Sequence, residues 1–189
     1  MNKPLILFLP INILLSCAGV GYDSAKLENL HRTLANETQK ASIYDGFQSR
    51  AFFKVIYRST ELRKQYADSV AEMESMTDTE KEALLLKELD EDKKFFDFYV
   101  VLSTTEFKAN DLNMKNSLWR IFLEDKSGAR IYPAEVREIK PNQKIKLLYP
   151  GVSRFGKFYH IRFEKKDQTD IRGFKLVFSS VLGKAVFRY

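Results

Sequence analysis

The fold is decided by the segment FFDFYVVL, residues 95–102, in which large apolar side chains occupy every second position. A period of two places Phe96, Phe98 and Val100 on one face of a β-strand. Short segments with the same alternation follow up to the C-terminus, and turns that contain glycine or proline separate them. Their apolar positions are Trp119, Ile121, Leu123, Tyr159, Ile161, Phe163, Phe174, Leu176 and Phe178. Short aromatic strands at this spacing predict an antiparallel β-sandwich.

Two helices are expected immediately before this segment, at about residues 59–94. Ser59 or Thr60 can cap the first helix, and residues 77–80, Thr-Asp-Thr-Glu, match a capping box for the second. Each helix has apolar residues at helical spacing, which predicts a side buried against the rest of the fold. These stripes are Leu62, Tyr66, Val70 and Met73 in the first helix, and Ala83, Leu84, Leu86 and Leu89 in the second.

A strand at about residues 47–58 precedes the helices, with Phe53, Val55 and Tyr57 on one side. A lone strand needs partners, so we expect it to join the same sheets as residues 95–189. The expected fold is then α+β: an antiparallel, immunoglobulin-like β-sandwich with a helical hairpin inserted after its first strand. The alternative is a helical N-terminal domain followed by a separate sandwich.

The N-terminal region carries one further helix. Leu27, Leu30 and Leu34 recur at helical spacing, which predicts a short helix from about Ala25 to Lys40 with Ser24 as its cap. Residues 17–24 contain two glycines and have no amphipathic period, so we interpret them as a flexible tether. A single domain is therefore expected over residues 25–189.

The first 16 residues have the layout of a signal peptide: Lys3 is followed by an apolar run from Pro4 to Leu15. That run is far shorter than the roughly 20 apolar residues that a membrane-spanning helix needs. It ends in Leu14-Leu15-Ser16-Cys17, which resembles the lipobox of bacterial lipoproteins. The resemblance implies cleavage between Ser16 and Cys17 and acylation of Cys17. The alternative is an ordinary secretory signal with a chance cysteine, or a buried N-terminal segment.

The resemblance also implies a location, the bacterial cell envelope, where acyl chains on Cys17 hold the protein on a membrane. Ala18 is similar to the residues that permit export to the outer membrane, which favours that membrane if the cell has one. Cys17 is the only cysteine of the chain. Its acylation would leave no thiol for a disulfide, a nucleophile or a metal site. The body is similar to uncharacterised lipoproteins with immunoglobulin-like sandwiches, and this similarity implies no particular activity.

Charge is distributed unevenly along the chain, whose net charge is +6. Residues 60–97 hold 6 basic and 12 acidic side chains, a net of −6, whereas residues 126–189 hold 15 and 5, a net of +10. One interpretation is that these are solvated faces that attract each other within the fold. Alternatively, the basic half binds an anionic envelope component, such as lipid phosphate or lipopolysaccharide, or another envelope protein.

A candidate binding strip lies in the basic half. Bases and aromatics interleave between residues 154 and 162, a pattern also used for nucleic acid, but an exported lipoprotein rarely meets nucleic acid and we expect none as a partner. On a strand, Phe158, His160 and Arg162 share the face opposite Tyr159, Ile161 and Phe163. That face is either a binding strip or an internal interface. The candidate residues are Arg154, Lys157, Phe158, His160 and Arg162.

Catalytic motifs are scarce. The two histidines, His31 and His160, exclude a histidine-rich metal site, and we expect no metal and no cofactor. Residues 151–156, Gly-Val-Ser-Arg-Phe-Gly, are one residue too long for a nucleophile elbow and are interpreted as a turn. Acids cluster at residues 90–92, and Asn110-Asp111 lies in a loop. The sequence thus predicts a membrane-anchored envelope lipoprotein that acts as a non-catalytic binding or scaffolding module. The alternative is an envelope hydrolase with a carboxylate-based site.

Overall fold

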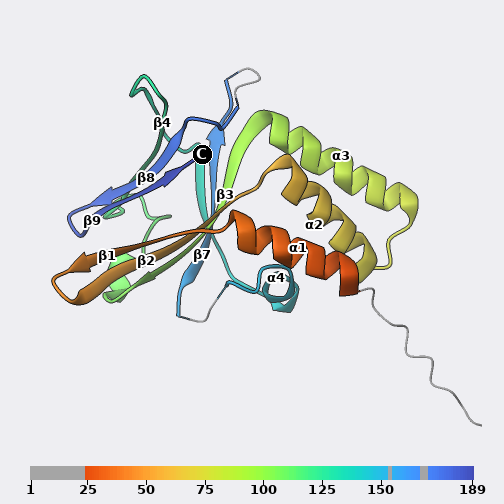
Figure 1. The fold of residues 1–189 in the computed structure, drawn as a ribbon, viewed down its shortest axis with the longest axis horizontal. Helices are drawn as coiled ribbons and strands as arrows, with labels where there is room; N and C mark the ends of the chain where they lie inside the picture. Colours follow the sequence, from red (N-terminus) through yellow and green to blue (C-terminus); the bar gives the residue numbers. More distant parts are fainter. Residues whose placement is uncertain (1–23, 153–154, 167–169) are drawn as a thin grey trace, which may run out of the picture.

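The computed structural model describes residues 24–152, 155–166 and 170–189, and its strands form two antiparallel sheets. The first sheet has the order β1-β2-β3-β7-β6 and the second β5-β4-β8-β9 (Figure 1). The strands are β1 (Gln39–Asp45), β2 (Gln48–Tyr57), β3 (Phe95–Thr104), β4 (Arg120–Glu124), β5 (Arg130–Ile131), β6 (Glu135–Ile139), β7 (Lys157–Glu164), β8 (Lys175–Ser180) and β9 (Gly183–Arg188). The helices are α1 (Ser24–Glu37), α2 (Thr60–Met73), α3 (Asp78–Lys94) and α4 (Gln143–Leu148), with a 3₁₀ turn at Phe107–Ala109. The prediction of an α+β fold dominated by antiparallel sheets is confirmed.

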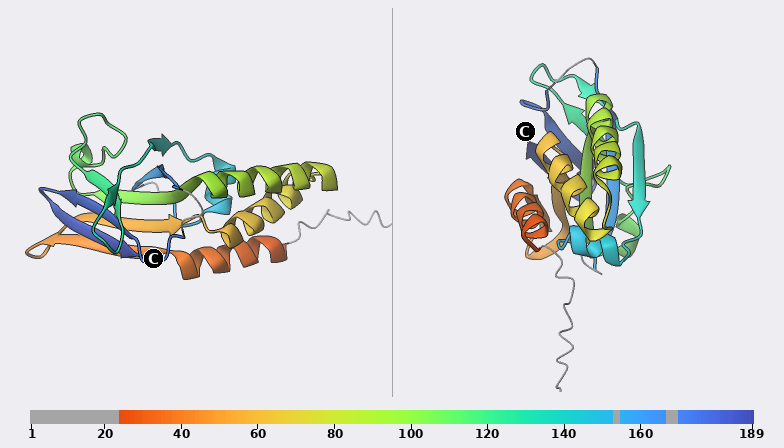
Figure 2. Two further views of the ribbon diagram at one scale, coloured as in Figure 1. Left: turned by 90° about the horizontal axis from the view of Figure 1, so that it is seen from above. Right: turned by 90° about the vertical axis from the view of Figure 1, so that its right-hand side faces the viewer.

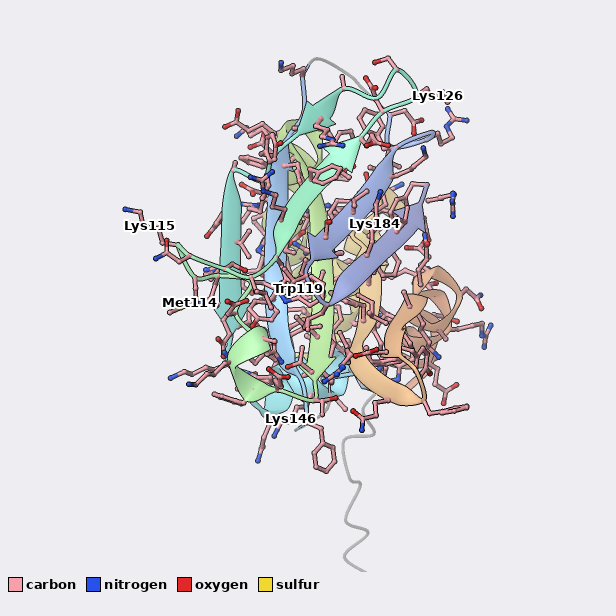
Figure 3. The ribbon with its side chains drawn as sticks, turned by 90° about the vertical axis from the view of Figure 1, so that its left-hand side faces the viewer. Met114, Lys115, Trp119, Lys126, Lys146 and Lys184 are labelled. Atoms are coloured by element: carbon pink, nitrogen blue, oxygen red, sulfur yellow. The ribbon has the colours of Figure 1, made fainter. Side chains whose placement is uncertain are left out.

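The main core lies between the two sheets and is built from the alternating residues of β3 and its neighbours. Phe98 is fully buried, and Phe53 packs against Phe178 and against the edge of Trp119. Trp119 lies inside the fold, whereas Lys115 and Lys126 project from its periphery (Figure 3). Because every aromatic side chain buried here removes a large apolar area from water, this core supplies most of the stability of the sandwich.

A second core lies on the other face of the five-stranded sheet, where the helices gather on one side of the sandwich (Figures 1 and 2). Leu30 and Leu34 of α1 pack there with Ile56 of β2, Val101 of β3 and Phe158 of β7. The central strands are consequently buried on both faces. This explains why residues 95–102 have almost no polar side chain.

Several helix boundaries follow from capping. Ser59 accepts a hydrogen bond from the amide of Leu62 at 3.2 Å and begins α2, and Thr77 and Glu80 form the capping box of α3. The expected buried stripe of α3 is wrong, because no residue of this helix is buried and Leu86 is exposed. Instead, α3 packs beside α2, and its Glu88 and Glu91 pair with Arg63 of α2 and Arg162 of β7.

The N-terminal helix was expected to continue to Lys40, and this boundary is wrong. α1 ends at Glu37, the amide of Thr38 donates to the carbonyl of Leu34 at 3.0 Å, and β1 begins at Gln39. β1 pairs with β2, so the strand expected at 47–58 is the second strand of the chain, and α2 and α3 lie between the second and third. Within the described residues, every helix is too short or too polar to span a membrane.

Candidate functional site

Three residues of the candidate strip, Phe158, His160 and Arg162 of β7, face the helices and not the solvent. Phe158 is 1% exposed and His160 5%, so neither can contact a partner at the surface. Arg162 is partly buried, and Lys157 lies 3.3 Å from Glu138. Arg154 lies outside the described residues. Phe158, His160 and Arg162 share one face, as predicted, and that face is an internal interface.

His160 and Arg162 belong to a buried group of charged and polar side chains that we call the Asp97 cluster, formed by Asp97, Arg63, His160, Arg162 and Glu88. Asp97 and Arg63 are fully buried. The carboxylate of Asp97 accepts hydrogen bonds from Arg162 Nε at 2.9 Å and from Arg63 Nη2, and its Oδ1 lies 3.0 Å from His160 Nε2. The cluster thus joins β3 and β7 to α2.

The environment of Asp97 decides its charge. Burial alone would raise the pKa of this carboxyl group, but hydrogen bonds from His160 and Arg162, together with the charge of Arg63, hold the pKa far below its usual range. A carboxylate so strongly stabilised in its ionised form is a poor proton acceptor. Asp97 therefore serves as an anion that holds the surrounding cations in place.

Glu88 extends the cluster into α3. Its Oε2 accepts from Arg63 Nη1 at 2.9 Å and from Arg58 Nη2 at 2.8 Å, while the Arg58 guanidinium lies over the ring of Tyr99, 4.9 Å from its centroid. Basic and acidic side chains therefore alternate between the helices and the five-stranded sheet. Since each buried charge has a partner, the cluster fixes the position of α2 and α3 over the sheet.

The acids singled out in the sequence have structural partners. Glu91 pairs with Arg162, and Asp92 Oδ1 lies 3.2 Å from Lys165 Nζ. Asn110 donates to the carbonyl of Leu102 at 2.7 Å and accepts from the hydroxyl of Tyr159 at 2.9 Å, whereas Asp111 accepts from Ser117 at 3.0 Å. Their side chains are thus engaged in holding loops and helix ends.

A pocket of about 330 Å³ opens between the second half of α1, the outer face of β1 and β2, and the segment after α4. Apolar side chains form most of its wall: Leu34, Ala35, Ile56, Val101, Pro150 and Val152. His31 borders the pocket, with Nε2 2.7 Å from the carbonyl oxygen of Leu147. The volume lies at the lower end of the range typical of small-molecule sites.

Two lysines give the pocket its charge. Lys40 of β1 and Lys54 of β2 are direct cross-strand partners and both line the pocket. Lys54 Nζ donates to the carbonyl of Gly151 at 3.4 Å. Neither ammonium group has an ion-pair partner among the residues that the structure describes, and none of the described lining residues is acidic. The pocket is therefore apolar with a cationic side.

A carboxylate-based site would need acids that converge on a pocket. In a second pocket, Asp45 and Glu106 come together, but both contact the same Arg50, at 2.7 and 3.7 Å, and both are exposed. Among residues 24–152, 155–166 and 170–189, no group of three or more potential ligand side chains could hold a metal ion.

The pocket was missed in the sequence because its two lysines come from a strand pair that the sequence did not reveal. Lys40 was assigned to the end of a helix, and Lys54 is one base within an apolar strand. Lys54 itself was a signal. It lies between Phe53 and Val55, which point into the core, so its side chain lies on the opposite face of the strand. A lysine is expected there only if that face is in contact with water.

Comparisons with known proteins give little further guidance. No protein-family model and no curated protein matches the sequence. A crystal structure of a protein of unknown function from Burkholderia pseudomallei K96243 is similar over 88% of this chain and 86% of that one, with 14% identity and a TM-score of 0.42.

Proposed function

We propose that this protein is a bacterial envelope lipoprotein, anchored through acylated Cys17, whose body is a non-catalytic binding module. The outer membrane is the expected location in cells that have one. Its partners are the membrane and an anionic envelope component or another envelope protein, and not nucleic acid. The lipobox at residues 14–17 supports the anchor, although residues 1–23 lie outside the described part of the chain. α1 begins only seven residues after Cys17, so the helical end of the molecule would face the membrane.

The body of this lipoprotein would be immunoglobulin-like. The strand order supports this: β2-β3-β7-β6 corresponds to strands A-B-E-D of an immunoglobulin sheet, and β5-β4-β8-β9 to C′-C-F-G. In this scheme β1 is an additional edge strand, and α2 and α3 form a helical hairpin inserted between strands A and B. Such sandwiches commonly serve as recognition modules, which agrees with a binding role.

The observation that carries the binding role is the pocket beside α1. Its wall is mainly apolar, it has few polar groups, and those groups converge from α1, β1 and β2. This combination is typical of small-molecule sites. The pocket also borders the second half of α1, the first helix after the anchor along the chain.

Anchoring is tested by growing cells that express the full chain with an alkyne-bearing fatty acid. The wild-type protein should take up the label and lose residues 1–16, whereas Cys17→Ala should remain unlabelled and uncleaved. Val20→Ala, three residues further on, serves as the matched control and should be processed normally. Labelling of Cys17→Ala at the wild-type level would refute the lipoprotein assignment.

Binding is tested with Nile red, an uncharged apolar dye, added to the full-length protein in membranes. Ala35 lines the pocket and is exposed, so Ala35→Trp should fill the opening and reduce saturable dye binding at least fivefold. Asn36→Trp adds the same side chain one position along α1, outside the lining, and should have no effect. Equal saturable binding by both variants would show that the pocket does not bind.

A further inference from the structure

We infer that the pocket beside α1 takes a single-chain amphiphile with an anionic head, a carboxylate or a phosphate, which Lys40 and Lys54 hold together. This inference rests on the proposed binding function and specifies its ligand. It is carried by three features of the pocket: the position of the two lysines, their lack of counter-charges and the apolar wall behind them.

The positions of the lysines follow from the strand pairing. Phe53 and Val55 point into the core between the sheets, so Lys54 between them points to the opposite face. Lys40 is its direct partner across the β1–β2 ladder, and facing residues in an antiparallel pair lie on the same side of the sheet. Both side chains therefore reach the same pocket, and a single anion could contact both ammonium groups.

Their lack of counter-charges makes an anion favourable. Like charges directly opposite each other destabilise a sheet, and folded proteins normally place an acid nearby. The chain does so elsewhere: Lys26, Lys81 and Lys157 each pair with a carboxylate. Lys40 and Lys54 have no such partner within the described residues. An anionic head between them would relieve the repulsion and form charge-assisted hydrogen bonds.

The wall decides what is attached to the anion. Its apolar part, which includes Leu34, Ile56, Val101 and Val152, offers no side-chain hydrogen-bonding group, so a sugar or a nucleoside placed against it would leave polar atoms unpaired. An acyl or alkyl chain has no such groups and gains free energy from burial. A small hydrophilic anion would contact the lysines but leave the wall empty. An anionic amphiphile satisfies both parts of the pocket.

The test is photocrosslinking to the full-length protein in cell membranes, with a diazirine-bearing dodecanoate and its methyl ester as probes. Both have the same chain, and only the acid is charged. We expect the acid to label residues of the pocket, as identified by mass spectrometry, at least tenfold more than the ester does. A diazirine-bearing dodecyl phosphate distinguishes a phosphate head from a carboxylate head.

Variants of the lysines supply the second arm. Lys40→Gln/Lys54→Gln should reduce labelling by the acid about tenfold and leave labelling by the ester unchanged, which also shows that the pocket is still folded. Lys40→Arg/Lys54→Arg should retain labelling. The matched control, Lys64→Gln/Lys184→Gln, removes two exposed lysines elsewhere and should behave as wild type.

The outcomes separate the two proposals. Equal pocket labelling by all probes, unaffected by the lysine variants, would overturn the anionic head while leaving the pocket as a binding site. Absence of pocket labelling by the acid, the phosphate and the ester would overturn both proposals.

Discussion

Replacing Asp97 with asparagine tests whether the Asp97 cluster holds the helices on the sheet. The substitution keeps the size of the side chain and removes its charge. It leaves the buried Arg63 and His160 without their anion, and loss of one partner from a buried ion pair typically costs 3–5 kcal/mol. Arg63 retains Glu88 at 2.9 Å and Arg162 retains Glu91, so we expect a loss of about 3 kcal/mol in unfolding free energy, at the lower end of that range.

The measurement is urea unfolding followed by the fluorescence of Trp119, the single tryptophan, which is buried in the core between the sheets. For a domain of this size, a loss of 3 kcal/mol also corresponds to a fall in Tm of roughly 6–12 °C. The control is Asp68→Asn, which breaks a solvated pair with Lys81 and should cost no more than about 1 kcal/mol. If Asp97→Asn costs as little as the control, the cluster does not hold the helices in place.

Three further predictions concern the same unfolding free energy. The hydroxyl of Tyr149 is buried with no hydrogen-bond partner in the described part of the chain, so Tyr149→Phe should be neutral or stabilise the protein by up to about 1 kcal/mol. Tyr159→Phe removes a hydrogen-bonded hydroxyl and should cost about 1–2 kcal/mol. A larger loss for Tyr149→Phe than for Tyr159→Phe would contradict this prediction. Gly183 has φ +135°, and a Cβ there would lie 2.7 Å from a side chain of β1, so Gly183→Ala should cost about 2–4 kcal/mol. Gly46 has φ +58° and lies in open space, so Gly46→Ala should cost about 1 kcal/mol. Equal losses for the two variants would argue against the close contact at Gly183. Because folding lowers the pKa of Asp97, its contribution to the unfolding free energy is present above the unfolded pKa of about 4 and is lost as the pH falls below that value. The unfolding free energy should therefore drop from about pH 5 towards pH 2. In an acid titration, Asp97→Asn should make this drop shallower.

The sequence predicted the period of each central strand but could not say which faces are covered. Alternation placed Phe158, His160 and Arg162 on one side of β7, as the structure has them. A polar face on a strand normally indicates solvent, and here it indicates buried ion pairs, because α2 and α3 bring Arg63 and Glu88 over it. Partners from a distant segment cannot be deduced from a local period.

β1 was missed for a related reason. Only Ile43 of this strand is buried, and residues 39–42, Gln-Lys-Ala-Ser, equally suit the end of a helix. As an edge strand it has a single partner, so burial imposes little pattern on its sequence. Lys40 was consequently assigned to a helix, and its pairing with Lys54 could not be predicted.

The uneven charge of the chain shows why net charge is a weak guide to binding. Arg162 of β7 and Lys165, which follows this strand, are far from α3 in sequence, yet Arg162 pairs with Glu91 and Lys165 with Asp92. The expected attraction between the two halves is therefore part of the fold, and these cations are already neutralised. Lys40 and Lys54 lie outside both charged regions, and neither has an acidic partner in the described part of the chain. A ligand responds to charges that folding leaves uncompensated, so this small pair is a stronger indication of an anion site than the net charge of +10 on residues 126–189.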